Sequence, residues 1–355
     1  FKEADKEIID DLKLNGRLYR KEMFVHSYPH CWRHKVPLMY YATDSWFIRT
    51  TDYKDKMVSV NKEINWHPPE YGTGRFGNWL EENRDWALSR NRFWGTPLPI
   101  WFYKDNDGKE VYECIGSYEE LKRKAKNYNE VYSDLEEFDV HKPFIDELIL
   151  ISETGEEMHR VEEVIDCWFD SGSMPFAQHH YPFENQELFK KSYPSDFIAE
   201  GLDQTRGWFY SLHAIGTFLF DKMAYKNLIV NGMILDKNGK KMSKSLGNAV
   251  DPFEMITKYG ADVLRFYLIY SSPVGKSKLF NETEIVEVKN KFFDTLINTF
   301  RFYVIYSELT GFSYNSKETV PVNKRSGIDR WILSKMTSTE KEYFQLMDGY
   351  DITKA

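Results

Sequence analysis

Residues 196–235, DFIAEGLDQTRGWFYSLHAIGTFLFDKMAYKNLIVNGMIL, contain the pattern that decides the fold. Two apolar, strand-like runs, 196–200 and 228–235, lie on either side of a helical segment. Four apolar residues of that segment share one helical face: Trp208, Leu212, Ile215 and Leu219. Because strand, helix and strand follow in that order, we expect a parallel sheet of the βαβ kind and therefore an α/β fold.

Strand-like runs also precede this segment, and turn residues follow two of them. The runs lie at residues 98–103, 147–152 and 164–169. Asp105-Asn106-Asp107-Gly108 and Glu153-Thr154-Gly155 are typical of hairpin turns. We therefore expect a β-hairpin insertion at about residues 103–160.

Helical patterns dominate the chain after residue 250. Asp251, Pro252 and Glu254 form a helix start, with an N-cap Asp, Pro at the first helical position and Glu at the third. A long amphipathic stripe follows, and a further helical run covers residues 328–347. The stripe consists of Ile285, Val288, Phe292, Leu296, Phe300 and Tyr303. We expect a helical domain that begins near Asn281.

The amino-acid composition excludes some classes of function. The 355 residues carry 47 basic and 55 acidic side chains, a net charge of −8 that excludes a binder acting through bulk positive charge. The three cysteines, Cys31, Cys114 and Cys167, show no paired spacing, which favours a reducing compartment. No run approaches the roughly 18 apolar residues of a membrane span. We expect a cytoplasmic protein with no membrane partner.

The segment 231–248, NGMILDKNGKKMSKSLGN, is the strongest candidate for chemistry. It leaves a strand through an Asn-Gly turn and forms a loop rich in lysine. Lysine is a mobile point charge that suits the charge developing on a phosphate leaving group. Glycines would let the loop close over a nucleotide and open again. On composition alone, a solvated basic loop without a catalytic role is the favoured alternative.

Within this segment, KMSKS at residues 241–245 resembles the signature loop of the class I aminoacyl-tRNA synthetases. Other strings resemble the isoleucyl family of that class, in order along nearly the whole chain. They are HSYPHCWR at 26–33, SRNRFWGTPLP at 89–99, DCWFDSG at 166–172 and EGLDQTRGWF at 200–209. The valyl and leucyl families carry different residues at 170–172 and 203–208.

The resemblance implies the second half of a Rossmann-like class I catalytic core, followed by the start of an α-helical anticodon-binding bundle. Residues 1–85 would be the tail of the editing insertion returning to the core. Residues 86–280 would be the nucleotide-binding domain, and 281–355 the start of the anticodon-binding domain. The family's His-x-Gly-His string and editing-site motifs are missing from the sequence. We therefore expect an internal fragment that cannot form adenylate alone.

The resemblance assigns adenylate contacts to Glu200, Gly201, Asp203 and Gln204. The local pattern agrees, because a strand ends at Gly201 and the next helix is expected near Asp203. Ligands of open α/β sheets bind at such strand ends, beside helix N-termini. The carboxylates would accept hydrogen bonds from a ribose hydroxyl or an amine. The plain alternatives are a helix N-cap for Asp203 and a surface carboxylate for Glu200.

The remaining implied roles fall on the lysine loop and on two tryptophans. Lys241 and Lys244 would be catalytic by stabilising the charge that leaves with pyrophosphate, and Ser243 and Lys244 would also contact ATP. Trp168 and Trp208 would line the pocket for the isoleucine side chain. An ordinary core position is the alternative for both tryptophans.

ATP and Mg²⁺ are the implied cofactors, whereas zinc is not supported within this chain. Some relatives carry Cys-x-x-Cys knuckles where this chain has its two hairpin turns. Cys31 and His34 keep a Cys-x-x-His spacing, which is half of a tetrahedral site. We favour a structural role without metal for this pair and predict no metal ligands.

The implied activity is that of an isoleucine–tRNA ligase, with isoleucine, ATP and tRNA(Ile) as partners. Basic residues of the helical part would contact tRNA or form a solvated face beside neighbouring glutamates. They are Lys289, Lys291, Arg301, Lys324, Arg325 and Arg330. The alternatives are a non-catalytic tRNA-binding paralogue, a valyl-type synthetase and a nucleotidyltransferase on a related α/β core. The intact strings at 241–245 and 200–209 disfavour the paralogue, and the helical domain disfavours the nucleotidyltransferase.

Overall fold

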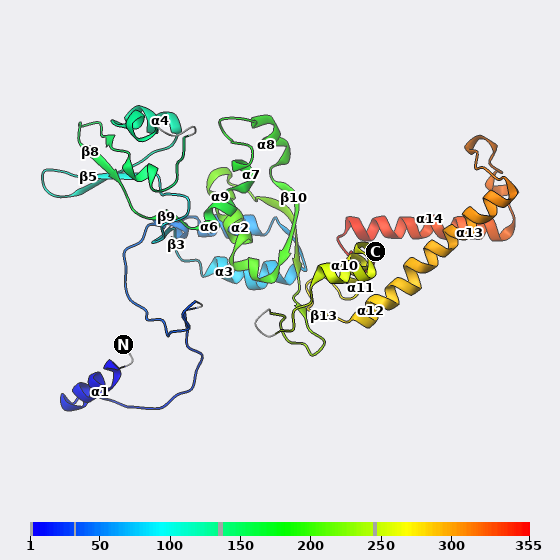
Figure 1. Ribbon diagram of the computed structural model, residues 1–355, viewed down its shortest axis with the longest axis horizontal. Helices are drawn as coiled ribbons and strands as arrows, with labels where there is room; N and C mark the ends of the chain where they lie inside the picture. The colour runs from blue at the N-terminus through cyan, green and yellow to red at the C-terminus, as the bar shows by residue number, and fades with distance from the viewer. Residues whose placement is uncertain (1–2, 32, 134–137, 244–246) are drawn as a thin grey trace. The chain divides into compact units, whose positions relative to one another are not determined.

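The computed structural model describes residues 3–31, 33–133, 138–243 and 247–355. It divides into two compact units, residues up to 46 and residues 47–355 (Figure 1). In the first unit, helix α1 (Ala4–Leu14) is followed by Gly16 at a φ of +65°, a left-handed conformation that suits glycine. An isolated antiparallel bridge joins His30 to Pro37.

The second unit is built on a parallel sheet of three strands. Its order is β10 (Ser195–Gly201), β11 (Tyr225–Asn231) and β2 (Asn65–His67), with β11 in the centre. β10 and β11 pair in register up to their last residues, Gly201 and Asn231. The α/β class and the parallel sheet expected from the sequence are confirmed.

Helix α9 (Trp208–Phe220) packs on one face of this sheet. Phe209 joins Leu228 and Val230 of β11 in one buried cluster. Removing each such side chain from water contributes about 1.5–3 kcal/mol. The helix that the sequence predicts between the two strands is therefore confirmed.

The predicted apolar face of α9 is buried along most of its length. Leu212 and Ile215 are buried, and Trp208 is half-buried. Leu219 is 59% exposed, because the helix ends at the next residue and leaves the sheet.

Residues before the first predicted boundary also belong to this unit. Helix α2 (Lys54–Asn61) contacts α9, and helix α3 (Gly77–Glu81) contacts α2. Because β2 also pairs within the sheet, residues 54–81 lie in the same core as the two later strands. The boundaries at residues 85 and 280 stay predictions.

An antiparallel sheet occupies the region predicted as a hairpin insertion. Its order is β6 (Glu110–Cys114), β5 (Ile100–Lys104), β8 (Glu157–Arg160) and β7 (Leu150–Ile151). The two predicted turns connect β5 to β6 and β7 to β8. A separate buried cluster around Trp101 supports this sheet.

The predicted strand at 164–169 is wrong in its second half. Strand β9 covers Val164–Ile165 only, and helix α6 (Cys167–Gly172) begins immediately afterwards. Asp166 causes the change, because its side chain accepts a hydrogen bond from the Trp168 amide at the helix start. Indole Nε1 of Trp86 and a guanidinium nitrogen of Arg90 donate to the other oxygen of the same carboxylate, at 3.1 and 2.8 Å.

The predicted strand at 228–235 is divided in two. β11 ends at Asn231, and the short strand β12 (Ile234–Leu235) leaves the sheet to pair in parallel with β13 (Lys278–Leu279). A separate two-stranded sheet therefore carries the start of the lysine loop.

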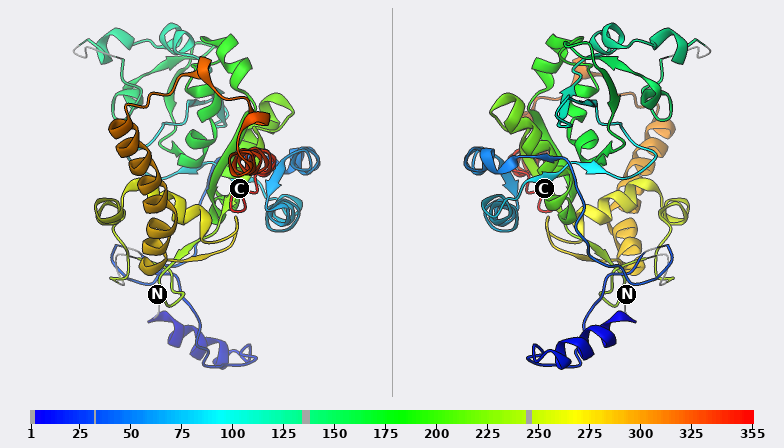
Figure 2. Two further views of the ribbon diagram at one scale, coloured as in Figure 1. Left: turned by 90° about the vertical axis from the view of Figure 1, so that its right-hand side faces the viewer. Right: turned by 90° about the vertical axis from the view of Figure 1, so that its left-hand side faces the viewer.

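The chain after the lysine loop is helical, as predicted. Asp251 caps α10 (Pro252–Tyr259) by accepting from the Phe253 amide at 2.8 Å. The following helices are α11 (Ala261–Tyr270), α12 (Glu282–Val288), η6 (Lys289–Phe293), α13 (Asp294–Thr310) and α14 (Gly327–Asp348). The last two are long helices joined by a loop (Figure 2).

Short elements complete the described chain. The strands are β1 (Phe47–Ile48), β3 (Trp86–Ala87) and β4 (Ser89–Arg90). The helices are α4 (Tyr118–Lys124), α5 (Tyr128–Val131), α7 (Met174–Ala177) and α8 (Gln186–Ser192). The 3₁₀ and π segments are η1 (Thr50–Tyr53), η2 (Tyr71–Phe76), η3 (Phe144–Glu147), η4 (Leu202–Arg206), η7 (Ser316–Glu318) and η8 (Val322–Lys324). Among the described residues, no helix has the length and apolar character needed to cross a membrane.

His213 lies on α9 in the fully buried core. Its Nε2 is 2.9 Å from the carbonyl oxygen of Met57, to which the neutral ring donates, and its Nδ1 has no partner among the described residues. Burial lowers the pKa of His213 to about 4, from an ordinary value of 6.5. The folded chain therefore keeps this ring neutral where the unfolded chain protonates it.

We predict that this difference makes the fold acid-sensitive. Stability from His213 is complete above pH 6.5 and falls as the pH decreases towards 4, because only the unfolded state takes up the proton there. Between pH 7 and pH 5 the free energy of unfolding should fall by about 2 kcal/mol more than in His213→Gln. Urea unfolding at both pH values measures this, and equal losses in the two proteins would contradict it.

Candidate functional site

Two loops leave the parallel sheet from the same edge. β10 ends at Gly201 and continues into η4, while β11 ends beside it at Asn231 and continues toward the lysine loop. Ligands of open α/β sheets bind at this edge, outside the carboxyl ends of the strands. The register therefore places η4 and the path to the lysine loop side by side at their starts. These two segments carry the two groups of predicted site residues.

The first group lies on η4, and Gln204 organises it. Its amide nitrogen donates to Asp203 at 3.1 Å, while its amide oxygen accepts from the Trp208 backbone at 3.0 Å. Gln204, and not Asp203, therefore satisfies the first amide of α9. Asp203 is exposed, and a Cβ at Gly201 would stand 2.7 Å from Asp203 Oδ1. Glycine at 201 thus leaves room for this carboxylate; Glu200 is also exposed.

Buried contacts hold η4 in place from below. Thr205 is fully buried, and its hydroxyl donates to the Leu202 carbonyl oxygen at 2.8 Å. The same hydroxyl oxygen accepts from Arg75 Nε at 2.9 Å. Arg206 lies over the Trp79 ring at 4.8 Å from its centroid. Arg75 comes from η2, so no local sequence signal reveals this contact.

The two predicted pocket tryptophans lie where α6 meets α9. The helices approach so closely that a Cβ at Gly172 would stand 2.8 Å from Ser211 Cβ. Indole Nε1 of Trp208 donates to the Ser171 carbonyl oxygen at 3.0 Å. The Trp168 ring would lie 3.0 Å from a Cβ at Gly207, the residue that precedes Trp208.

Trp168 is 39% exposed, whereas Trp208 is half-buried and packs against the main core cluster. The pocket role of both tryptophans stays a prediction. Asp170 lies on α6, the short helix that also carries Trp168. Burial raises the pKa of Asp170, an effect opposed by a hydrogen bond from Thr96 and increased by the charge of Asp166. The geometry brings both tryptophans near Gln204 and leaves part of the indole surface accessible.

Asp236 and Asn248 organise the lysine loop from its two ends. Asp236 Oδ1 accepts from the backbone amides of Asn238 and Lys240, at 2.9 Å each. Asn248 Nδ2 donates to Asp236 Oδ2 at 2.9 Å and to the Lys241 carbonyl oxygen at 3.2 Å. Its oxygen accepts from the Ser243 amide at 2.9 Å.

This network gives the loop a defined start and exit. Lys241 is exposed and forms an isolated bridge with Leu235. Lys244, predicted as catalytic and ATP-binding, lies outside the described residues. Asp236 and Asn248 are not among the residues predicted for the site, although an Asp two residues before an Asn-Gly pair and an Asn after a Gly are turn signals.

The predicted absence of metal ligands is not tested by the geometry. Cys31 Sγ is 3.6 Å from His34 Nδ1, and hydrogen bonds from the backbone of His34 and Arg33 lower the pKa of the thiol. Within the described ranges, no three His, Cys, Asp or Glu side chains come together as a metal-ligand group.

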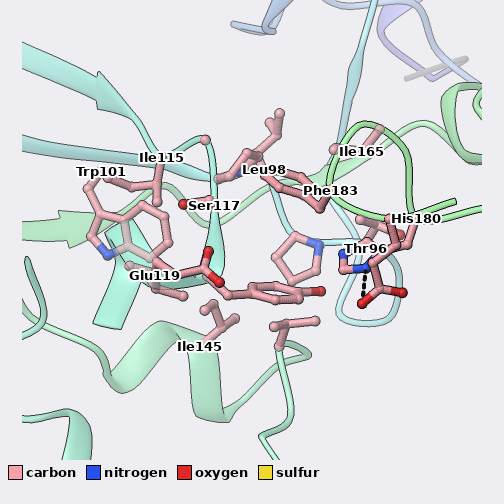
Figure 3. Close-up of a pocket in the computed structure, with 17 residues that line it drawn as sticks. Thr96, Leu98, Trp101, Ile115, Ser117, Glu119, Ile145, Ile165, His180 and Phe183 are labelled. Atoms are coloured by element: carbon pink, nitrogen blue, oxygen red, sulfur yellow. Dashed lines mark ion pairs between the residues drawn. The ribbon is translucent and has the colours of Figure 1, made fainter. Parts of the chain in front are cut away.

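A cavity of about 620 Å³ lies against the antiparallel sheet, away from the sheet edge described above (Figure 3). Its walls are mainly apolar, with Trp101 and Ile145 on one side and Phe183 on another. His180 and Glu184 form an ion pair in its wall, at 3.5 Å. None of the described residues predicted for the site lines this cavity. This cavity therefore does not support the predicted chemistry.

The chain is similar to proteins of known family along most of its length. Residues 1–280 match the family model described as tRNA synthetases class I (I, L, M and V). The chain is 51% identical to the isoleucine–tRNA ligase of Cytophaga hutchinsonii over 356 residues, 99% of this chain and 32% of that protein. It is 48% identical to the Thermus thermophilus isoleucine–tRNA ligase over 353 residues, 99% of this chain and 33% of that protein. The chain thus spans about a third of the length of these curated relatives.

Solved structures show the same fold. Mycobacterium tuberculosis methionyl-tRNA synthetase in complex with methionyl-adenylate matches with a TM-score of 0.60 at 16% identity, over 93% of this chain and 53% of that one. Its apo form matches with a TM-score of 0.57 at 15% identity, over 93% and 52% of the two chains.

We predict that Asn248 controls the ionisation of Asp236. The hydrogen bond from Asn248 is the largest cause that lowers the pKa of Asp236, ahead of the Lys240 amide. In Asn248→Ala the pKa of Asp236 should therefore rise towards its ordinary value of 3.8, whereas Asn238→Ala should leave it unchanged. Titration of the side-chain carboxyl carbon by NMR measures both variants. An unaltered titration in Asn248→Ala would show that the loop is not closed by this contact.

Proposed function

The chain belongs to the class I tRNA synthetase family, and from that premise we propose that it contributes the nucleotide-binding half of an isoleucine–tRNA ligase. The observation that carries this proposal is the shared sheet edge, where Gly201 and Asn231 end side by side. The residues that resemble the family's adenylate and signature strings both start from that edge. The relatives with about 50% identity over almost the whole chain support isoleucine as the amino acid.

The proposed reaction has two steps. A carboxylate oxygen of isoleucine attacks the α-phosphorus of ATP, and the bond between the α- and β-phosphates breaks with its electron pair leaving on pyrophosphate. A ribose hydroxyl at the end of tRNA(Ile) then attacks the carbonyl carbon of the adenylate. AMP leaves with the electron pair of the C–O bond, and the hydroxyl proton is released. The residues act by positioning and by electrostatics, without a covalent protein intermediate.

We assign adenylate binding to the residues at the end of β10. Glu200 and Asp203 are exposed acceptors for hydroxyl or amine groups, and glycine at 201 leaves room for the Asp203 carboxylate. Gln204 already donates to Asp203 and caps α9, so it holds the acceptor in a fixed position. A ligand placed here also faces the first amides of α9, which favour negative charge.

Lys241 supplies charge to the departing pyrophosphate in this proposal. Its ammonium group is exposed on a loop whose ends are tied by Asn248, so the loop can close without losing its start and exit. Lys244 and Ser243 of the same string would assist by contacting ATP. Mg²⁺, when bound to ATP, would neutralise further phosphate charge.

Trp168 and Trp208 would form the wall of the isoleucine pocket. The Trp168 ring lies against Gly207, the residue before Trp208, and Ser171 fixes the Trp208 ring through its carbonyl oxygen. Apolar indole area favours a branched aliphatic side chain, and Gln204 lies within reach of its carboxyl end. Helices α12, α13 and α14 would begin the tRNA-binding part, and a cytoplasmic location would suit this activity.

The proposal predicts that Lys241 is essential. The test uses a chimera in which residues 1–355 replace the segment of the Cytophaga hutchinsonii relative that aligns with them over 356 residues. Isoleucine-dependent ATP–pyrophosphate exchange of this chimera is measured. Lys241→Ala should lower kcat by about 100-fold or more, as expected for losing a charge that acts in the transition state. Lys237→Ala, an exposed lysine in the same loop, should change it by less than about 3-fold.

Two results would overturn the assignment. Equal rates of ATP–pyrophosphate exchange in Lys241→Ala and Lys237→Ala would contradict the role of Lys241. ATP–pyrophosphate exchange that depends on valine and not on isoleucine would contradict isoleucine as the substrate.

A further inference from the structure

We propose that Lys278 is a positioning residue for the lysine loop: its ammonium group fixes the β12–β13 stem of that loop to the carboxyl end of helix α11. This inference rests on the proposed function, because it assigns to Lys278 the placement of Lys241. Lys278 is not one of the residues proposed to contact ATP, isoleucine or tRNA. It lies in β13, more than thirty residues after the loop begins.

The stem of the loop needs support from outside itself. β12 and β13 are two residues each and pair Ile234 with Lys278 and Leu235 with Leu279. The Lys278 amide donates to the Met233 carbonyl oxygen, and the Phe280 amide donates to that of Leu235, both at 2.8 Å. An isolated two-stranded pair is at best marginally stable in water. Its position therefore depends on whatever anchors β13.

The entry to the stem is packed backbone against backbone. A Cβ at Gly232 would stand 2.0 Å from the Lys276 carbonyl oxygen and 2.3 Å from its carbonyl carbon. No side chain fits such a gap, so residue 232 must be glycine for β12 to reach β13. This contact fixes where the chain turns away from β11, and the Tyr71 hydroxyl donates to the Gly275 carbonyl oxygen at 3.1 Å just before β13. Neither contact joins β13 to helix α11.

The Lys278 side chain supplies that anchor. Its ammonium nitrogen donates to the Leu268 carbonyl oxygen and to the Ser272 carbonyl oxygen, the latter at 3.0 Å. Leu268 lies in the last turn of α11 and Ser272 follows the helix end (Figure 1). Carbonyl groups there lack helical partners and carry the negative end of the helix dipole, so a cation is favoured.

The same ammonium group is half-buried, which distinguishes it from a surface helix cap. Burial lowers the pKa of Lys278, so the charge is kept at a desolvation cost. The two carbonyl oxygens offset this cost. Replacing the ammonium by an apolar group would leave the Leu268 carbonyl oxygen without this donor and the Ser272 carbonyl oxygen with the Thr353 hydroxyl, at 3.2 Å. The link between β13 and α11 through Lys278 would then be lost.

Tyr267 gives the stem a second, weaker link to the same helix. Its hydroxyl donates to the Leu279 carbonyl oxygen at 3.0 Å and accepts from the Asn281 amide at 2.9 Å. The ring is buried, so Tyr267→Phe removes this link with little change in packing. This variant provides a test of the anchor that leaves the charge of Lys278 in place.

Hydrogen exchange of the 355-residue chain tests the anchor directly. In Lys278→Met, exchange of peptides covering residues 233–243 should increase about 10-fold or more, while peptides from β10 and β11 keep their rates. Tyr267→Phe should produce a smaller increase at the same peptides. Lys278→Arg, which keeps donors and charge, should restore most of the protection. Lys276→Met, an exposed lysine two residues away, should leave it unchanged.

The chimera with the Cytophaga hutchinsonii relative then tests the consequence for chemistry. Lys278→Met should lower kcat for ATP–pyrophosphate exchange by about 10-fold with the KM for isoleucine unchanged, and Lys278→Arg should recover most of that loss. The inference is overturned if loop exchange is unchanged in Lys278→Met, if Lys278→Arg is as defective as Lys278→Met, or if Lys276→Met is equally slow. A normal rate in Lys241→Ala would instead refute the proposed function, whatever Lys278 does to exchange.

Discussion

The parallel pairing of β10 with β11, in register up to Gly201 and Asn231, is the constraint on which the site depends. Slipping this register by one residue would turn Leu228 and Val230 away from α9 and expose a core face. Burial of that face therefore fixes where both strands end. Because they end together, η4 and the path to the lysine loop begin at one edge of the sheet. The electrostatic role proposed for the loop follows from that arrangement.

Glycines convert this arrangement into close contacts between elements. Gly172 lets α6 approach α9, and Gly207 makes room for the Trp168 ring beside Gln204. Gly232 lets the chain turn from β11 to β12 against the backbone of Lys276. At each position a side chain would meet another atom at 3.0 Å or less. These close contacts act together with the Trp208–Ser171 hydrogen bond to place the tryptophans, and Lys278 adds a charged anchor to the loop stem.

Much of the fold follows from local pattern. The βαβ segment, the Asp251 cap and the hairpin turns depend on neighbours in sequence, so their residues suffice to predict them. The start of α6 and the path after the Asn-Gly turn at 231–232 follow only in part. Arg90 and Trp86 hold the capping Asp166, and Lys276 packs against Gly232, and all three residues are distant in sequence. For the site, spacing indicates a loop and a strand end. The roles of Trp168, Trp208 and the lysines come from family resemblance. Asp236 and Asn248 have turn signals in the sequence, whereas Arg75 and Lys278 emerge only from the contacts.

The most direct test is a crystal structure of the chimera with a non-hydrolysable isoleucyl-adenylate analogue and pyrophosphate. The account predicts the nucleotide at the end of β10, with its sugar or amino group bonded to Glu200 or Asp203. Lys241 Nζ should lie within about 3 Å of a pyrophosphate oxygen, the distance of a charge-assisted hydrogen bond. A nucleotide bound elsewhere, or a lysine loop that stays away from the pyrophosphate in the complex, would contradict it.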